Sequence, residues 1–174
     1  MELPKRKPQR LKEYDYSQSN AYYITICTKD RMPLLGKIEC GNMVLSEFGK
    51  KVKEKLLNIS RRNDTGVVPY IFSIDKYCIM PNHIHAIILI LKNNRQKNDI
   101  TIFDIVKQFK TVTTRIYIDY VQAGNYEPFN KKIWQKSFYD RIIRNETDYQ
   151  HTWKYIDENV LKWNEDEMNT DNLM

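Results

Sequence analysis

Apolar residues recur along the chain with two periods, and these periods predict its secondary structure. Runs rich in β-branched and aromatic residues predict strands at 21–28, 67–80, 83–91 and 133–143. Apolar residues spaced three or four apart predict helices at 46–59, at 101–116 and at 146–163. The order strand, helix, strand, strand, helix, strand, helix predicts an α+β fold, namely a ferredoxin-like antiparallel sheet with helices and an extra C-terminal helix.

The most apolar strand begins with two of the three histidines, His83 and His85. Residues i and i+2 of a strand point to one face, so the two imidazoles are expected side by side. The strand continues apolar on both faces, as in a central covered strand, where polar rings need partners. The pair is therefore either half of a metal site or, more plainly, two histidines at a solvent-facing strand end. Pro81 and Asn82 predict a tight connection to the preceding antiparallel strand.

Two stripes run along the last predicted helix. The apolar stripe, expected to face the core, consists of Tyr149, Trp153, Ile156, Val160 and Trp163. A second stripe, roughly 120° around the helix, carries Tyr155 and Asn159, which are four residues apart and lie one above the other. The phenol and the amide either face a functional site together, or Tyr155 is a partly exposed tyrosine on a solvated helix.

These groups suit one chemistry. Two imidazoles and a neutral amide oxygen can hold a divalent cation while leaving coordination positions open. A tyrosine beside that cation could attack a phosphodiester whose non-bridging oxygen the metal polarises. Such an attack gives a covalent phosphotyrosine, which keeps the energy of the broken bond for rejoining.

Composition narrows the class of protein. The 174 residues suffice for one domain with a buried core, and the 41% hydrophobic content excludes a disordered chain. No apolar run approaches the ~20 residues of a membrane helix, and no hydrophobic signal segment begins the chain, so a cytoplasmic protein is expected. Three cysteines without C-x-x-C spacing indicate reduced thiols rather than disulfides or a cysteine zinc site.

Charge divides the chain into three parts. We expect a basic arm at 1–19, a folded domain at 20–163 and an acidic tail at 164–174. The net charge is +6, and the tail carries four carboxylates and no cation, so the rest of the chain carries +10. A basic body favours a polyanionic partner such as nucleic acid, although lysine-rich proteins are also basic without one. The candidates for phosphate contact are Lys5, Arg6, Lys7, Arg10, Lys107 and Lys110.

Several short motifs together resemble one family. They are YDYSQ at 14–18, YITICT at 23–28, MPNHIH at 80–85, WQ at 134–135, IIRNE at 142–146 and LKW at 161–163. With these residues the chain resembles the HUH single-strand DNA endonucleases, named for a histidine–hydrophobe–histidine motif. More narrowly, it is similar to the single-tyrosine, transposase-like proteins associated with repeated extragenic palindromes (REP). The resemblance covers nearly the whole chain.

The resemblance implies an activity and assigns roles to residues. Tyr155 matches the nucleophile, and His83, His85 and Asn159 match the metal ligands. The implied enzyme is a transposase-like endonuclease and strand transferase that acts on single-stranded or hairpin DNA through a 5′-phosphotyrosine. The implied cofactor is a divalent cation, Mg²⁺ or Mn²⁺. The expected protein is a monomer or homodimer without a membrane partner.

Two other functions fit the same residues. One is a non-catalytic protein of the same fold that binds hairpin DNA. The other is a metal-dependent phosphoester hydrolase in which water is the nucleophile. Replacing Tyr155 with Phe separates the second from the tyrosine enzyme, because hydrolysis by water survives the change and transesterification by tyrosine does not.

Overall fold

A computed structural model describes residues 14–59, 72–91 and 100–169. Four of the candidates for phosphate contact, Lys5, Arg6, Lys7 and Arg10, lie outside these residues, as do residues 67–71 of the second expected strand. The elements are β1 (Asn20–Cys27), η1 (Lys29–Arg31), β2 (Gly36–Glu39), β3 (Asn42–Leu45), α1 (Glu47–Ile59), β4 (Phe72–Ile79), β5 (His83–Ile90), α2 (Ile102–Gln122), β6 (Tyr139–Ile143), α3 (Glu146–Glu158) and η2 (Trp163–Glu165).

Four strands form one antiparallel sheet in the order β4-β5-β1-β6. Strand β1 therefore lies in the middle, beside β5, although the two are far apart in sequence. With α1 after β1 and α2 after β5, this order is the ferredoxin-like arrangement expected from the sequence. The expected tight connection is also present, because β4 ends at Ile79, β5 begins at His83, and the two strands pair antiparallel.

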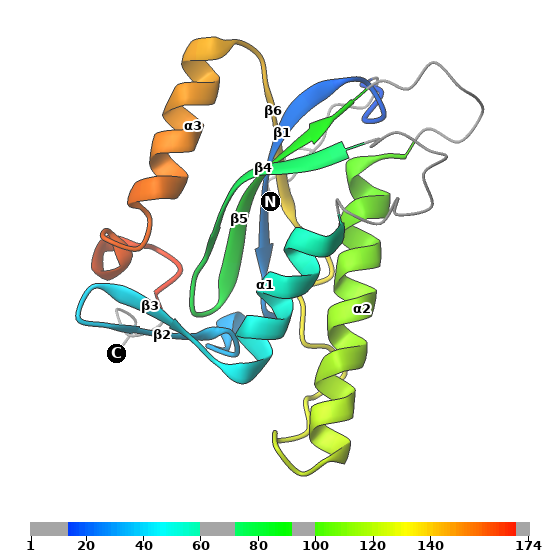
Figure 1. The fold of residues 1–174 in the computed structure, drawn as a ribbon, viewed down its shortest axis with the longest axis vertical. Coiled ribbons are helices and arrows are strands. Elements are labelled where there is room, and N and C mark those ends of the chain that lie inside the picture. The colour runs from blue at the N-terminus through cyan, green and yellow to red at the C-terminus, as the bar shows by residue number, and fades with distance from the viewer. Residues whose placement is uncertain (1–13, 60–71, 92–99, 170–174) are drawn as a thin grey trace, which may run out of the picture.

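The two faces of the sheet are covered by different helices. The even-numbered residues of β1 and β5, such as Ile24 and Ala86, pack in the large core with α1 and α2. The odd-numbered residues, such as Tyr23 and Ile87, pack in a smaller cluster with Ile156 of α3. Figure 1 shows α3 on one side of the sheet, with α1 and α2 on the other. His83 and His85 are odd-numbered and therefore lie on the face that α3 covers.

The helix starts follow local sequence signals. Thr101 caps α2 in a capping box with Asp104, and Asn145 caps α3 by accepting a hydrogen bond from the backbone N–H of Asp148.

No helix within residues 14–59, 72–91 or 100–169 is long and apolar enough to span a membrane.

The strand expected at 133–143 is shorter than predicted. Only Tyr139–Ile143 forms β6. The residues at 133–138 do not continue this strand. Trp134 makes an isolated bridge to Thr28, and its indole N–H donates to Thr113 Oγ1 at 3.0 Å. The aromatic and apolar residues of this segment therefore fill the core from a loop, which a strand-like composition alone does not distinguish.

The last helix is also shorter, and its expected stripe is partly wrong. Helix α3 ends at Glu158 rather than near residue 163. Its buried residues are Thr152 and Ile156, whereas Trp153 is exposed and lies under the Lys76 ammonium, 3.5 Å from the ring centroid. Trp163 is buried, but on η2 after the helix. Because the chain turns after Glu158, the helical period no longer applies beyond that residue.

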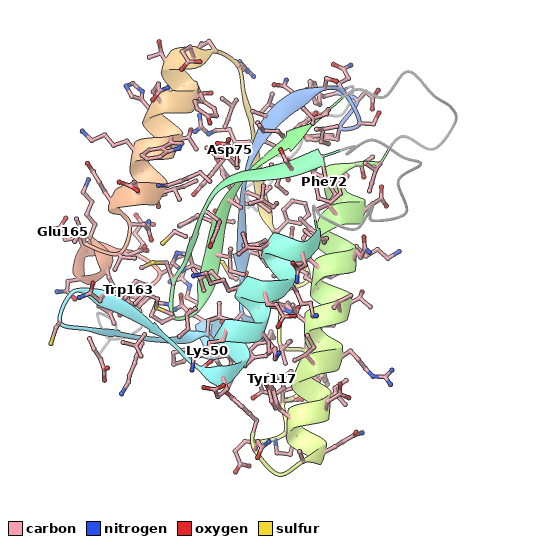
Figure 2. All side chains as sticks on the ribbon, in the orientation of Figure 1. Lys50, Phe72, Asp75, Tyr117, Trp163 and Glu165 are labelled. Carbon is pink, nitrogen blue, oxygen red and sulfur yellow. The ribbon has the colours of Figure 1, made fainter. Side chains whose placement is uncertain are left out.

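The ends of the described chain pack on the domain. Tyr16 is buried in the core near Phe103, with ring centroids 4.9 Å apart. At the other end, the Asn82 amide donates to the backbone oxygen of Met168 at 2.7 Å, and the Asn169 amide donates to Trp163 O at 3.2 Å. Figure 2 shows Trp163 and Glu165 on the segment that follows α3. The first residues of the expected acidic tail thus lie against the sheet.

Candidate active site

His83 and His85 form the centre of the site. They begin β5, opposite Cys27 and Thr25 of β1, and both side chains are buried. Their rings lie 4.5 Å apart between centroids, and the two Nε2 atoms are 3.0 Å apart. The side-by-side arrangement expected from the sequence is confirmed, and the burial excludes the solvent-facing alternative.

Asn82 fixes the protonation of the His83 ring. Its amide nitrogen donates to the backbone oxygens of Arg31 and Met168, at 3.2 and 2.7 Å, so its Oδ1 is the atom that faces His83. That oxygen lies 2.8 Å from His83 Nδ1 and can only accept. His83 therefore carries its proton on Nδ1, and its neutral ring presents the Nε2 electron pair to the centre of the site.

His85 is held from the neighbouring strand. Its Nδ1 lies 2.6 Å from the Tyr23 hydroxyl and 2.9 Å from Thr25 Oγ1. Tyr23 also stacks on the imidazole, with ring centroids 5.5 Å apart. Both partners come from β1 at alternate positions, so one rigid strand sets the orientation of the ring and points its Nε2 at that of His83.

Burial keeps both rings neutral. It lowers the pKa of His83 to about 3, with Arg31 acting in the same direction and the Asn159 amide opposing it. It lowers the pKa of His85 to about 3 as well, with His83 adding to the effect and Asp166 opposing it. Neutral imidazoles are the form that binds metals.

Asn159 lies immediately beyond the last residue of α3, at its C-cap, and its side chain is buried. No hydrogen-bond donor in the described part of the chain reaches its Oδ1 with suitable geometry. A buried amide oxygen without a donor is costly, and a cation would satisfy it. The side chain of Asn159 interacts with His83, so Asn159 lies beside the histidines.

Asp166 is a further acidic group at the site. Its side chain is 12% exposed, and one carboxylate oxygen lies 3.9 Å from His83 Nε2. Ligand atoms of His83, His85 and Asp166 all lie within 4.8 Å of one another, close enough to hold one metal ion. Sequence reasoning assigned this residue only to the acidic tail.

Tyr155 lies at the edge of the site. Its ring meets that of His85 edge to face, with centroids 5.3 Å apart, and that of Tyr23 at 6.2 Å. The side chain remains 47% exposed, so a large substrate can reach the phenol. Burial and Asp166 raise the pKa of Tyr155, whereas hydrogen bonding to Asn159 and Tyr23 acts in the lowering direction.

The expected site residues thus fall into two groups. The structure brings together Tyr155, His83, His85 and Asn159, with Asp166 beside them. Lys107 is exposed on α2, and the Lys110 ammonium donates to the backbone oxygens of Gln135 and Ser137, at 2.8 and 3.0 Å. These two lysines lie away from the histidines, on the helix that covers the opposite face of the sheet.

Sequence reasoning gave no role to Tyr23, Thr25, Asn82 or Asp166. The first two could have been recognised, because alternate polar residues on a strand paired with the histidine strand share a face with the histidines. Asn82 directly precedes His83 and its amide is a natural partner for a ring nitrogen. Asp166 had no local signal, because its place depends on how the chain turns after α3.

The donors fit a divalent cation. Two neutral imidazole nitrogens and a carboxylate lie around one point, and the unsatisfied amide oxygen of Asn159, whose side chain interacts with His83, adds a further donor of the same kind. The half-exposed phenol beside this set is positioned to approach a group bound there.

Solved structures share this fold. A REP-associated tyrosine transposase bound to a REP hairpin is 22% identical, with a TM-score of 0.52 over 87% of this chain and 74% of that one. A candidate transposase of Deinococcus radiodurans is 18% identical, with a TM-score of 0.50 over 86% of this chain and 95% of that one. At these identities the likeness shows the fold.

Sequence relatives show the family. An uncharacterized protein of Haemophilus influenzae is 32% identical over 185 aligned positions, which cover 95% of this chain and 94% of that protein. The sequence profile of the family described as "Transposase IS200 like" matches residues 16–159. That match includes both histidines, Tyr155 and Asn159. The chain belongs to the family of IS200-like transposases.

Proposed function

We propose that this protein cleaves and joins single-stranded DNA at hairpins or repeats, with Tyr155 as the nucleophile and a divalent cation as cofactor. The observation that carries the proposal is the position of Tyr155, whose half-exposed phenol makes a T-shaped ring contact with the buried His85, the neighbour of His83. The solved transposase bound to a REP hairpin, which shares the fold, supports hairpin DNA as the substrate class.

His83, His85 and Asn159 would hold the cation, with Asp166 as a further oxygen ligand. When bound, Mg²⁺ or Mn²⁺ would polarise a non-bridging phosphate oxygen and balance charge that develops in the transition state. The unsatisfied Oδ1 of Asn159 supports this assignment, because a buried oxygen without a donor is unfavourable unless a cation binds it. The Nε2 atoms of the two histidines lie close enough together to bind the same cation.

The protein residues perform the bond exchange. The Tyr155 oxygen attacks phosphorus, a new phosphorus–oxygen bond forms, and the bond to the 3′-oxygen of the leaving strand breaks. The phenol proton passes to solvent, which the exposed half of the side chain contacts, and the leaving 3′-oxygen takes up a proton. Asn159 assists by lowering the pKa of Tyr155 through its hydrogen bond, against the raising effect of burial.

Rejoining reverses the same steps. A 3′-hydroxyl from another strand attacks the 5′-phosphotyrosine, and the phenol leaves and recovers a proton. One phosphoester is exchanged for another, so no nucleotide is consumed. Tyr155, the histidines and Asn159 all belong to one chain, and we therefore propose that a monomer contains the complete cleavage site.

The test is cleavage of end-labelled hairpin DNA with Mg²⁺ or Mn²⁺, analysed on denaturing gels. Wild type should form a band of DNA covalently bound to protein, which is absent after chelation and in Tyr155→Phe. The matched control is Tyr149→Phe, another tyrosine on α3, which hydrogen-bonds Asp75 rather than contacting the site, and it should still form the band. Cleavage that survives Tyr155→Phe would instead establish water as the nucleophile. If the protein binds a panel of hairpins and cleaves none of them, it is a DNA-binding protein without this activity.

A further inference from the structure

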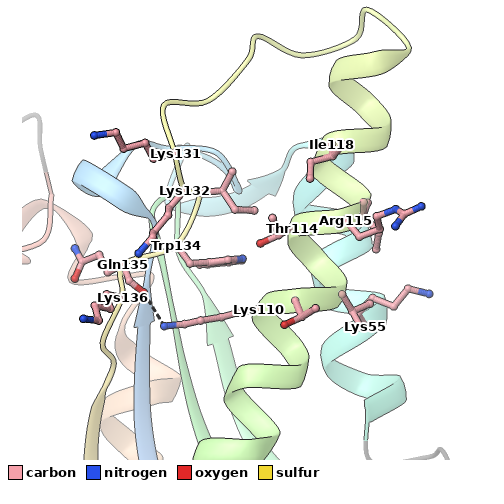
Figure 3. A pocket seen from close by; sticks show the side chains of 14 residues that line it. Lys55, Lys110, Thr114, Arg115, Ile118, Lys131, Lys132, Trp134, Gln135 and Lys136 are labelled. Atoms are coloured by element: carbon pink, nitrogen blue, oxygen red, sulfur yellow. Dashed lines mark hydrogen bonds between the residues drawn. The ribbon is translucent and has the colours of Figure 1, made fainter.

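A basic groove lies away from the histidines, between α2 and residues 131–136. It has a volume of about 890 Å³ and is lined by the cations Lys55, Lys110, Arg115, Lys131, Lys132 and Lys136. No carboxylate is among the residues that line it. Figure 3 shows Lys131, Lys132 and Lys136 along one wall, with Lys110, Arg115 and Lys55 on the side of the helices.

Three of these cations have no internal counter-charge. Lys131, Lys132 and Lys136 are exposed, and no carboxylate in the described ranges lies within ion-pair distance of them. Exposed lysines elsewhere are often paired, as Lys50 is with Glu47. Three neighbouring unpaired ammonium groups repel one another, and an anion between them relieves that repulsion.

The lysine-bearing segment is held rigidly. The Trp134 indole donates to Thr113 Oγ1 at 3.0 Å, and the Lys110 ammonium donates to the backbone oxygen of Gln135 at 2.8 Å. On the other side, the backbone N–H of Gln135 donates to Cys27 O at 2.9 Å. Groups held in place before binding lose less entropy when a ligand arrives.

The groove continues toward the catalytic residues. A second hollow, lined by Lys29, Asp30 and Arg31, shares Gln135 and Lys136 with the first. Asp30 is paired with Lys29, and Arg31 donates to the backbone oxygen of Glu167 at 2.6 Å. The basic surface therefore extends to Arg31, whose partner Glu167 directly follows Asp166 in the chain.

A single residue separates the lysine segment from the site. Thr28 bridges to Trp134 on one side, and its backbone N–H donates to Asn82 O at 2.9 Å on the other. Asn82 in turn orients His83. The buried Thr28 therefore links the lysine segment to the histidines at the end of β1.

We propose that this groove, defined by Lys131, Lys132, Lys136, Lys110 and Arg115 and continued past Lys29, binds the phosphate backbone of the substrate DNA beside the cleaved bond. The proposal rests on the proposed function for its substrate class. Lysine and arginine contacts to phosphates position a nucleic acid without reading its sequence. The groove therefore sets affinity and placement, and it leaves selection of the cleaved sequence to other contacts.

The test measures binding separately from cleavage. A fluorescent DNA hairpin with a single-stranded extension is titrated with protein carrying Tyr155→Phe, in chelator, and anisotropy gives the affinity. The groove variant carries Lys131→Gln, Lys132→Gln and Lys136→Gln. The matched control carries Lys37→Gln, Lys50→Gln and Lys53→Gln, three exposed lysines outside the groove lining that remove the same charge. Thermal unfolding of each variant checks that it is folded.

We expect the groove variant to bind the hairpin at least about tenfold more weakly. The slope of log K against log salt concentration should be smaller in magnitude by about 2 to 3. The control should change by less than about twofold. Lys132→Glu alone should weaken binding in the same direction. Equal losses in both triple variants, or no loss in the groove variant, would overturn the proposal.

A second measurement separates this proposal from the catalytic one. With Tyr155 restored, the groove variant should need a higher DNA concentration than wild type to form the covalent complex. If neither wild type nor the groove variant forms the covalent complex, and the groove variant binds DNA more weakly than wild type, the catalytic proposal fails and the groove proposal stands. If the groove variant binds normally while wild type cleaves, the groove proposal fails and the catalytic one stands.

Discussion

Asn82 and His83 are adjacent in sequence, and the amide oxygen of Asn82 accepts a hydrogen bond from His83 Nδ1 at 2.8 Å. The amide nitrogen is committed to two backbone oxygens, so this polarity cannot reverse. The contact therefore selects the tautomer in which His83 Nε2 is free to bind a metal. It also links the ring to the segment that follows α3, through Met168.

Replacing Asn82 should disturb metal binding without touching a ligand. We expect Asn82→Ala to weaken Mn²⁺ binding by about 10- to 100-fold, because loss of a partner that orients a metal-binding histidine has effects of this size. Stability should fall by about 1–3 kcal/mol through the unpaired carbonyls of Arg31 and Met168. Calorimetric titration with Mn²⁺ and urea unfolding measure the two effects. Asn42→Ala, which removes an exposed amide that bonds Cys40 O, is the control and should change neither.

Replacing Asn159 should have a small effect on the stability of the metal-free protein and a larger effect on that of the metal-bound protein. In chelator, Asn159→Leu should lower the free energy of unfolding by no more than about 1 kcal/mol, because the buried Oδ1 has no donor to lose and the hydrogen bond to the half-exposed Tyr155 is the one that is removed. With saturating Mn²⁺, wild type should gain melting temperature and the variant should gain much less, since a ligand stabilises only the state that binds it. An equal gain in both proteins would remove Asn159 from the metal site.

Asp166 should contribute to metal affinity despite its position beyond α3. We expect Asp166→Asn to weaken Mn²⁺ binding by about tenfold, since it keeps the shape but removes the charged oxygen. Glu165→Gln removes the same charge one residue earlier, on an exposed side chain, and should have little effect. Electron paramagnetic resonance of free Mn²⁺ gives both affinities. If the two variants behave alike, the effect of Asp166 is only one of general charge.

Asp148 should make stability depend on pH. Burial would raise its pKa, but hydrogen bonds from the Arg141 guanidinium and the Arg144 backbone hold the pKa below its ordinary value. A carboxylate whose pKa is lower in the folded state than in the unfolded state binds fewer protons when the protein is folded. It therefore stabilises the folded protein at neutral pH. This contribution is lost as the pH falls through the pKa of the folded state. The bond joins β6 to α3, which carries Tyr155.

We therefore expect Asp148→Asn to cost about 1 kcal/mol or more at pH 7 and clearly less in strong acid. Urea unfolding at both conditions measures the difference. Asp157→Asn on the same helix, where the carboxylate is more exposed and pairs with Lys76, is the comparison for removal of one negative charge from α3. A constant difference between wild type and Asp148→Asn at all pH values would contradict the assignment.

The sequence by itself determined the local relationships of the site. Alternation along a strand placed His83 and His85 on one face, and helical spacing stacked Tyr155 on Asn159. The order of strands and helices also predicted the ferredoxin-like sheet, which the strand order confirms. These predictions succeed because backbone geometry alone decides which residues of one element share a face.

Only the tertiary structure decided which faces meet. The apolar pattern of the last helix predicted Trp153 in the core, yet α3 lies on the sheet with Thr152 and Ile156 buried, and Trp153 packs under Lys76. Asp166 reaches the histidines because the chain turns after Glu158, and the basic groove forms because Trp134 anchors a loop to α2. Periodicity fixes the faces of an element, but the packing of distant segments determines what each face contacts.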